Sequence, residues 1–161
     1  MPQVFVAAGS NVDPIAHLRQ ALDELAKIYS SLEISPAYRN KAVGFEGEDF
    51  INLVVRFTAE DSIHQVRRNL QEVEKRCGRP ADSPKWAPRT IDLDILLYDQ
   101  LISDEPGLIL PRPDLIRRAY MLKPMVDIAP EVMHPTLHKS MRALWESFDR
   151  DGHEMRQIEL R

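Results

Sequence analysis

The chain has 161 residues, of which 43% are hydrophobic and 29% charged, and its formal net charge is −4. This length suits one domain with a sizeable core, and the apolar fraction excludes a disordered chain. Because 25 acidic residues outnumber 21 basic ones, the chain does not attract phosphate backbones overall, which argues against nucleic acid as the main partner. Cys77 is the single cysteine, so an internal disulfide is excluded.

The sequence predicts neither a membrane segment nor a secretory signal. Its apolar runs fall well short of the roughly 20 residues that span a bilayer. The opening MPQVFV lacks the basic region and cleavage site of a signal peptide. We therefore expect a soluble cytoplasmic protein with no membrane partner, folded as one domain over residues 1–161. A single compact domain suggests a monomer.

The first half of the chain predicts strands that alternate with a helix. Residues 3–8 have the pattern of a buried strand, followed by a turn at 9–11. Asp13 and Pro14 are typical of a helix start. One apolar stripe then follows at steps of three and four: Ile15, Leu18, Leu22, Leu25 and Ile28. Strands are expected at 32–38 and 50–57, joined by a polar loop.

A second helix has clear signals at both ends. Ser62 and Gln65 match a capping box, and Gly78 stands where a C-terminal cap belongs. The expected buried face consists of Ile63, Val66, Leu70, Val73 and Cys77. Cys77 is therefore interpreted as a small core residue.

The second half predicts one strand and then mainly helices. We expect a strand at 90–98, a short segment at 101–102, and helices near 115–122 and 140–147, whereas 153–161 is ambiguous. The order β-α-β-β-α-β followed by helices predicts an α+β fold. In detail, we expect a ferredoxin-like βαββαβ core with an antiparallel sheet and extra C-terminal helices.

Prolines gather in the second half of the chain. Nine of the 12 lie at or after Pro80, and Pro80, Pro84 and Pro88 recur every four residues. Proline fixes φ and removes a donor, so this stretch is neither a helix nor a central strand. It leads directly into the strand that carries Asp92 and Asp94.

Asp92 and Asp94 are the strongest candidates for chemistry. Residues two apart on a strand share a face, and two adjacent carboxylates repel unless a cation or strong donors lie between them. Such oxygen ligands suit Mg²⁺, and Arg89 is close enough in sequence to bind phosphate beside them. The alternative is a solvated sheet face on which the aspartates pair with Arg89 or Lys85.

The run from Trp86 to Asp94, WAPRTIDLD, closely resembles the signature of the 6-hydroxymethyl-7,8-dihydropterin pyrophosphokinases of folate biosynthesis. The resemblance extends over nearly the whole chain. It includes Gly9-Ser10-Asn11, the Glu74…Gly78-Arg79 end of the second helix, and the later runs RAYMLKP at 118–124 and IAPE at 128–131.

The resemblance implies an ATP-dependent diphosphotransferase that uses ATP, a pterin and two Mg²⁺ ions and releases AMP. It assigns the metal to Asp92 and Asp94, and catalysis to the same aspartates with Arg79 and Arg89. The implied ATP-binding residues are Gln71, Glu74, Trp86, Arg112 and Arg118. The implied pterin-binding residues are Val43, Gly44, Phe50, Asn52 and Tyr120. Residues 79–89 would form a stiff lid over the site. No general base is assigned.

Three stretches differ from the family's usual pattern. Residues 40–44 (NKAVG) lack its prolines and add a charge, Arg112 replaces a histidine between two prolines, and Ala81-Asp82-Ser83 replaces a lid cation. Two other interpretations therefore stay open. One is a diverged paralogue that uses ATP and Mg²⁺ on another alcohol, and the other is a non-enzymatic ferredoxin-like binding module.

Other polar groups have simpler interpretations. His134 and His138 have a ligand spacing only if they are helical, and the glutamate of the helical zinc motif is missing. Gly9-Ser10-Asn11 lacks the lysine of a P-loop and is interpreted as a turn that lines the site. Arg67-Arg68 and Arg117-Arg118 are interpreted as solvated faces, apart from the family match at Arg118.

Overall fold

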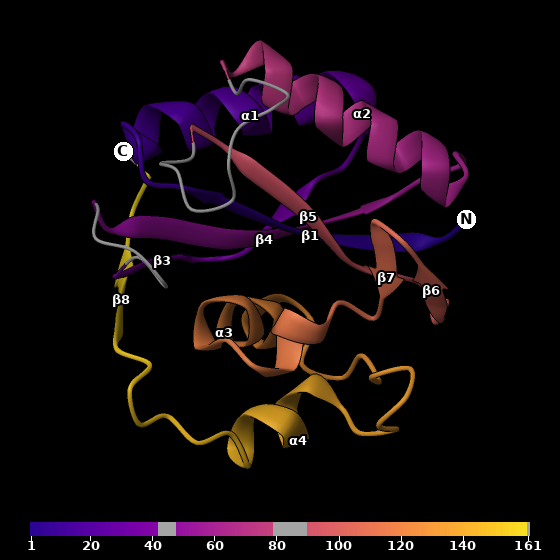
Figure 1. Ribbon diagram of the computed structural model, residues 1–161, viewed down its shortest axis with the longest axis vertical. Helices are drawn as coiled ribbons and strands as arrows, with labels where there is room; N and C mark the ends of the chain where they lie inside the picture. Colours follow the sequence, from indigo (N-terminus) through magenta and orange to yellow (C-terminus); the bar gives the residue numbers. More distant parts are fainter. Residues whose placement is uncertain (42–47, 79–89, 161) are drawn as a thin grey trace.

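A computed structural model describes residues 1–41, 48–78 and 90–160. In chain order its elements are β1 (Gln3–Ser10), α1 (Pro14–Ile28), β2 (Glu33–Ile34), β3 (Ala37–Asn40), β4 (Phe50–Thr58), α2 (Ile63–Arg76), β5 (Asp92–Tyr98), β6 (Ser103–Glu105), β7 (Leu108–Leu110), the 3-10 helix η1 (Pro113–Ile116), α3 (Ala119–Ile128), α4 (Met141–Glu146) and β8 (Met155–Ile158). Figure 1 shows three layers, in which α1 and α2 cover one face of a central sheet and α3 and α4 cover the other.

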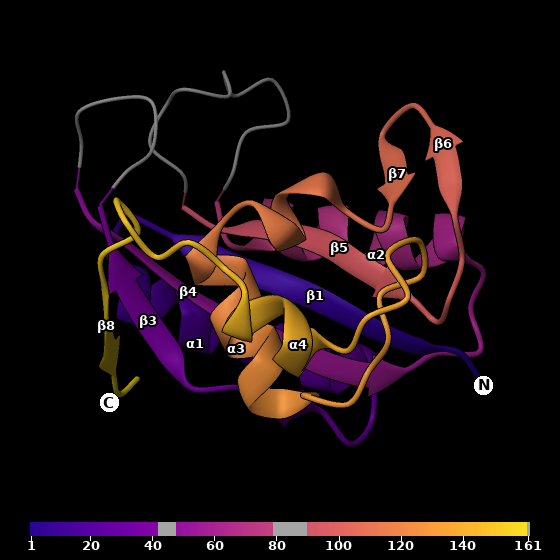
Figure 2. The same ribbon diagram turned by 90° about the horizontal axis from the view of Figure 1, so that it is seen from below.

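The strands of the central sheet run antiparallel to their neighbours. Their order is β5-β1-β4-β3-β8, and the short β2 also pairs with β4. β6 and β7 form a separate hairpin, which lies beside α2 in both views (Figure 1, Figure 2). The expected mixture of helices with an antiparallel sheet, followed by C-terminal helices, is confirmed.

α1 and α2 each turn an apolar stripe toward the sheet, as the sequence spacing predicts. Their buried residues are Leu18, Ala21 and Leu25 in α1, and Val66, Leu70 and Val73 in α2. The Ser62 hydroxyl accepts a 3.2 Å hydrogen bond from the Gln65 backbone N–H, so the predicted cap is present. Asp13 is the N-cap residue of α1, but its φ is 43° and its side chain makes no cap hydrogen bond.

Two strands of the first half have other bounds than the sequence predicts. β1 continues through Gly9 and Ser10, so the predicted turn at 9–11 is wrong there. The predicted strand 32–38 is divided into β2 and β3 at Ser35-Pro36, because Pro36 has no N–H for a ladder. The Ser35 hydroxyl instead accepts a 2.8 Å hydrogen bond from the backbone N–H of Val54.

The second half differs more. The short segment at 101–102 has no regular secondary structure and leads into the hairpin strands β6 and β7, which are joined by a turn in which Gly107 has a φ of 82°. The predicted helix 115–122 consists of η1 and the start of α3, which continues past Pro124 to Ile128. The ambiguous end contains β8, which pairs with β3.

Both faces of the sheet are buried. In β1, Val4, Val6 and Ala8 belong to the core under α1 and α2, whereas Phe5 and Ala7 belong to the core under α3 and α4. Cys77 packs in the first core, and burial raises the pKa of its thiol, which fits a packing role. None of the helices in the described ranges is long and apolar enough to cross a bilayer.

Candidate active site

One row of residues crosses the sheet near the end of β5. The strand register places Asp92 opposite Gly9, Gly9 opposite Asn52, and Asn52 opposite Tyr38. Residues paired in this way turn their side chains to the same face of a sheet. The row therefore brings a carboxylate, an amide and a phenol to one face, with a gap at the glycine.

Asp94 lies two residues further along β5 and shares this face. It is paired with Ala7, whose side chain belongs to the core under α3. Both aspartates are partly buried on the α3 side of the sheet. The structure thus places the two carboxylates side by side on one face, as the alternation of a strand predicts.

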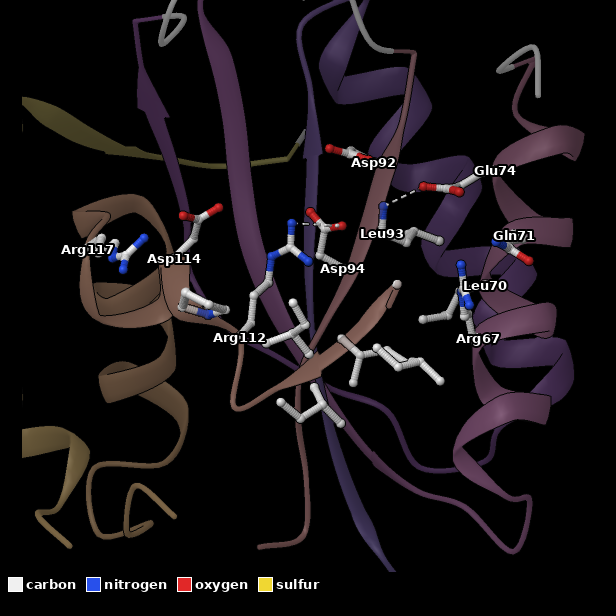
Figure 3. Close-up of a pocket in the computed structure, with 16 residues that line it drawn as sticks. Arg67, Leu70, Gln71, Glu74, Asp92, Leu93, Asp94, Arg112, Asp114 and Arg117 are labelled. Atoms are coloured by element: carbon white, nitrogen blue, oxygen red, sulfur yellow. Dashed lines mark hydrogen bonds and ion pairs between the residues drawn. The ribbon is translucent and has the colours of Figure 1, made fainter. Parts of the chain in front are cut away.

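A cavity of about 560 Å³ opens over the two aspartates (Figure 3). It lies between α2 on one side and the start of η1 on the other, with β5 and β7 between them. Five predicted site residues meet here: Gln71, Glu74, Asp92, Asp94 and Arg112. The structure thus groups the expected metal ligands with three of the expected ATP-binding residues.

Three contacts hold the charged groups of this cavity in place. Arg112 Nη2 lies 3.5 Å from Asp94 Oδ1, and the Arg112 backbone N–H donates a 3.0 Å hydrogen bond to the carbonyl of Leu96. On the other side, Glu74 Oε2 accepts a 2.9 Å hydrogen bond from the Leu93 backbone N–H. Within the described part of the chain, the buried Nε of Arg112 has no hydrogen-bond partner. The Arg112 side chain as a whole is 34% exposed, so its outer N–H groups can bind a further anion beside Asp94.

Arg118 and Tyr120 lie elsewhere, in a second cavity of about 290 Å³. It is lined by Asn40, Lys41, Arg118, Ala119, Tyr120 and the C-terminal residues 152–155. Burial raises the pKa of the Tyr120 phenol, so this side chain stays neutral across the physiological range. Arg118 therefore lies beside Tyr120, a predicted pterin-binding residue. It does not line the cavity that contains the other described residues predicted to bind ATP.

Asn52 is connected to this second cavity through Asn40. Asn52 is only 7% exposed, and its Nδ2 donates to the Asn40 Oδ1 across the β3–β4 pair. A Cβ on Gly9 would overlap the Asn52 Oδ1, so only glycine leaves room for this amide. Phe50 lies two residues from Asn52 on the same face of β4.

The remaining predicted site residues cannot be placed. Val43, Gly44, Arg79, Trp86 and Arg89 lie outside the described residues, as does Lys85, the cation of the alternative interpretation. The expected lid over residues 79–89 lies outside them too.

Two arginines that the sequence suggested were solvated line the aspartate cavity. Arg67 stands four residues before Gln71 and seven before Glu74, and all three line the cavity from one face of α2. Arg117, not Arg118, reaches the cavity from the end of η1 (Figure 3). The helical spacing from Gln71 was the signal that could have identified Arg67.

His134 has a structural role in a turn. It is 3% exposed, and its Nδ1 accepts hydrogen bonds from the backbone N–H groups of Thr136 and Leu137 at 3.3 and 3.1 Å. With Nδ1 accepting these bonds, the neutral ring carries its proton on Nε2, so neither nitrogen offers a lone pair to a metal and His134 does not serve as a ligand with His138.

The donor set on β5 suits a hard cation. Among the described residues, no group of three or more histidine, cysteine, aspartate or glutamate side chains could hold a metal ion by itself. Two carboxylates on one face of a polar cavity match Mg²⁺, which commonly takes one or two carboxylates together with water and phosphate oxygens.

Residues 5–130 match the family model described as 7,8-dihydro-6-hydroxymethylpterin-pyrophosphokinase (HPPK). The chain belongs to the HPPK family. The matched segment contains all the described strands of the aspartate cavity and both predicted sets of binding residues.

Relatives in the HPPK family cover most of the chain. The 2-amino-4-hydroxy-6-hydroxymethyldihydropteridine pyrophosphokinase of Aquifex aeolicus is 34% identical over 144 residues, which is 88% of this chain and 89% of the relative. The enzyme of the same name from Pseudomonas aeruginosa is 33% identical over 137 residues, or 83% of this chain and 84% of the relative.

Solved structures share the HPPK fold at low identity. The wild-type Plasmodium falciparum HPPK-DHPS protein with pteroate superposes with a TM-score of 0.72 over 91% of this chain at 11% identity. This chain covers only 44% of that longer protein. The likeness shows the fold alone.

Proposed function

We propose that this protein transfers the diphosphate of ATP to the hydroxymethyl group of 6-hydroxymethyl-7,8-dihydropterin, giving AMP and the pterin diphosphate in folate biosynthesis. The observation that carries the proposal is the pair Asp92 and Asp94 on one strand face, within a cavity that also contains Arg112. Carboxylates for a metal beside an arginine for phosphate are the groups that phosphoryl transfer needs. Membership of the HPPK family supports the choice of substrates.

In this proposal Asp92 and Asp94 hold two Mg²⁺ ions together with the triphosphate. Mg²⁺ held by these two side chains would supply neutralisation of charge on the transferred group and on the leaving AMP. The carboxylates of Asp92 and Asp94 would keep the metal charge at one place over β5. Arg112, whose Nη2 lies 3.5 Å from Asp94 Oδ1, adds a hydrogen-bond donor there. Alignment and charge neutralisation supply most of the catalysis in such transfers.

ATP occupies the 560 Å³ cavity in this proposal. Gln71, Glu74 and Arg112 line it, and their position supports the assignment. Arg79, Trp86 and Arg89 are assigned to ATP and its phosphates by family resemblance alone. Arg118 is likewise assigned to ATP by family resemblance alone; it lines the second cavity, beside Tyr120.

The pterin is proposed to bind between Phe50 and Tyr120, with its edge read by the amide of Asn52. Phe50 and Asn52 share one face of β4 with the α3 helix over it, and α3 carries Tyr120. The carbonyl oxygen of Asn52 remains available as an acceptor once its Nδ2 donates to Asn40. Val43 and Gly44 are assigned to the same pocket by resemblance.

The finer features of the fold and assembly belong to the proposal as well. We propose a ferredoxin-like core, which the strand order β5-β1-β4-β3 with α1 and α2 on one face supports. We also propose one domain that acts as a cytoplasmic monomer. Gel filtration with light scattering tests the oligomeric state, and a dimer mass would contradict it.

The test is an assay of AMP formation with ATP, Mg²⁺ and hydroxymethyldihydropterin. The enzyme should form AMP and pterin diphosphate in equal amounts, and removal of Mg²⁺ with EDTA should stop both. If neither AMP formation nor Mg²⁺-dependent ATP binding is detected, only the non-enzymatic binding module remains.

A second candidate is a paralogue that uses another alcohol. Its support is Lys41, which places an additional cation in the second cavity beside Tyr120. Tight Mg²⁺-dependent ATP binding without turnover of the pterin would favour this candidate.

A further inference from the structure

Arg67 lines the aspartate cavity but is not among the site residues predicted from the sequence. It projects from the first half of α2 into the aspartate cavity, at the end away from Asp92 and Asp94 (Figure 3). Seven residues separate it from Glu74, which corresponds to about 10 Å along a helix at 1.5 Å per residue. Glu74 lies level with the aspartates because it binds Leu93 between them.

The wall between these two ends is apolar. Leu70, Ile95, Leu108 and Leu110 line the cavity and are almost completely buried. A triphosphate bound at the aspartates would therefore leave its nucleoside against an apolar surface that ends at Arg67. Ligand pockets commonly combine such a wall with a few polar groups that fix orientation.

The guanidinium of Arg67 lies close to the β6–β7 turn. A Cβ on Gly107 would lie 2.6 Å from its Nη2 and 3.0 Å from both its Cζ and its Nη1. The flat group therefore lies against the backbone of Gly107, whose φ of 82° also favours glycine. His64, one turn earlier on α2, contacts Glu105 of the same hairpin at 2.9 Å.

The guanidinium N–H groups of Arg67 make no hydrogen bond or ion pair with other described residues, whereas its neighbour Arg68 donates to Gln65 at 2.9 Å. A partly buried guanidinium that lines a cavity with unused donors suits a planar ligand with acceptor atoms.

We propose that Arg67 is a specificity residue for the nucleotide: its guanidinium binds the nucleoside moiety of ATP at the end of the cavity opposite Asp92 and Asp94. The inference rests on the proposed use of ATP in this cavity. It assigns Arg67 to the base and ribose, and leaves the phosphates to the groups around the aspartates.

The experiment compares two ligands that share the phosphates but not the nucleoside. Binding of Mg–ATP and of Mg–tripolyphosphate is measured by calorimetry for the wild type, Arg67→Met, Arg67→Lys and the matched control Arg68→Met. Arg67→Met should weaken ATP binding about 10-fold, the scale of one charge-assisted hydrogen bond. Its affinity for tripolyphosphate should stay within about twofold, as should both affinities of Arg68→Met.

Arg67→Lys should resemble Arg67→Met, because lysine keeps the charge but loses the planar fork. Gly107→Ala is a second variant that displaces the guanidinium from the turn and should show the same ATP-selective loss. An equal loss for ATP and tripolyphosphate, or unchanged ATP binding, would overturn the proposal. The binding measurement contains no pterin and does not depend on turnover. Absence of AMP formation in the separate assay would therefore contradict the proposed function but would leave the binding result valid.

Discussion

The backbone N–H of Leu93 donates a 2.9 Å hydrogen bond to Glu74 Oε2. β5 is the last strand of its sheet, so this N–H points to an open edge, and α2 supplies the acceptor that a further strand would have supplied. Leu93 stands between Asp92 and Asp94. The contact therefore fixes the spacing between α2 and the two carboxylates.

Glu74→Ala should lower the free energy of unfolding by about 1–2 kcal/mol, because it leaves the partly buried Leu93 N–H without this acceptor. The Mg–ATP affinity should fall as well, since α2 is no longer fixed against β5. Urea unfolding and calorimetry measure the two effects. Glu74→Gln keeps an acceptor oxygen and should retain most of the stability; identical losses in both variants would contradict the role of this hydrogen bond.

Asp94→Asn should reduce kcat about 100-fold or more, because it removes charge that holds the metal at the transferred group. The apo protein should keep its melting temperature, since relief of the repulsion between two adjacent carboxylates offsets the loss of the partly exposed ion pair with Arg112. Steady-state assays and thermal unfolding check both statements. Asp23→Asn, an exposed position on α1, is the matched control. Unchanged turnover in Asp94→Asn would refute the metal assignment.

Gly9→Ala should selectively damage the pterin side of the site. The new Cβ meets the Asn52 Oδ1, so the amide must move and its bond to Asn40 must break. We expect the KM for the pterin to rise about 10-fold, the cost of one lost hydrogen bond to a buried group. The affinity for Mg–ATP should change little. Asn40→Ala should reproduce this pattern, and an unchanged KM in both folded variants would speak against Asn52 as a pterin ligand.

Protein stability should depend on pH through His134. Burial and the nearby His138 lower the pKa of His134 from its ordinary value of 6.5. The unfolded chain thus binds this proton more readily than the folded one, so stability is full above pH 6.5 and falls as the pH drops below it. The melting temperature should decline between pH 7 and about 5.5, and less steeply in His134→Asn. Equal slopes in the two proteins would rule out this histidine.

The parts of the site that could be predicted are those fixed by local periodicity. Asp92 and Asp94 share a face because strand side chains alternate, and Gln71 and Glu74 share one because they lie three residues apart on a helix. The capping signals at Ser62 and Gly78 likewise depend on neighbouring residues only. These rules need no knowledge of the rest of the chain.

What could not be predicted depends on contacts between distant segments or on single backbone angles. β8 forms because it can pair with the open edge of β3, which nothing in residues 155–158 alone reveals. Arg117 and Arg118 are adjacent, yet Arg117, the C-cap of η1, has right-handed backbone angles whereas Arg118 is extended with a φ of −122°. Their side chains therefore reach different cavities. The position of Arg67 against Gly107 depends on the unpredicted β6–β7 turn.

The row Asp92–Gly9–Asn52 fixes the distance between the proposed sites of the two substrates. Asp92 and Asn52 lie on strands separated by β1 alone, and two strand spacings amount to about 9–10 Å. A hydrogen-bonded sheet buried on both faces resists stretching, so the backbone ladder sets the distance between the proposed metal ligand Asp92 and Asn52, the proposed pterin ligand. A ligand in which a pterin is joined to a phosphate chain must have a linker that matches this distance, because the sheet does not adjust to it.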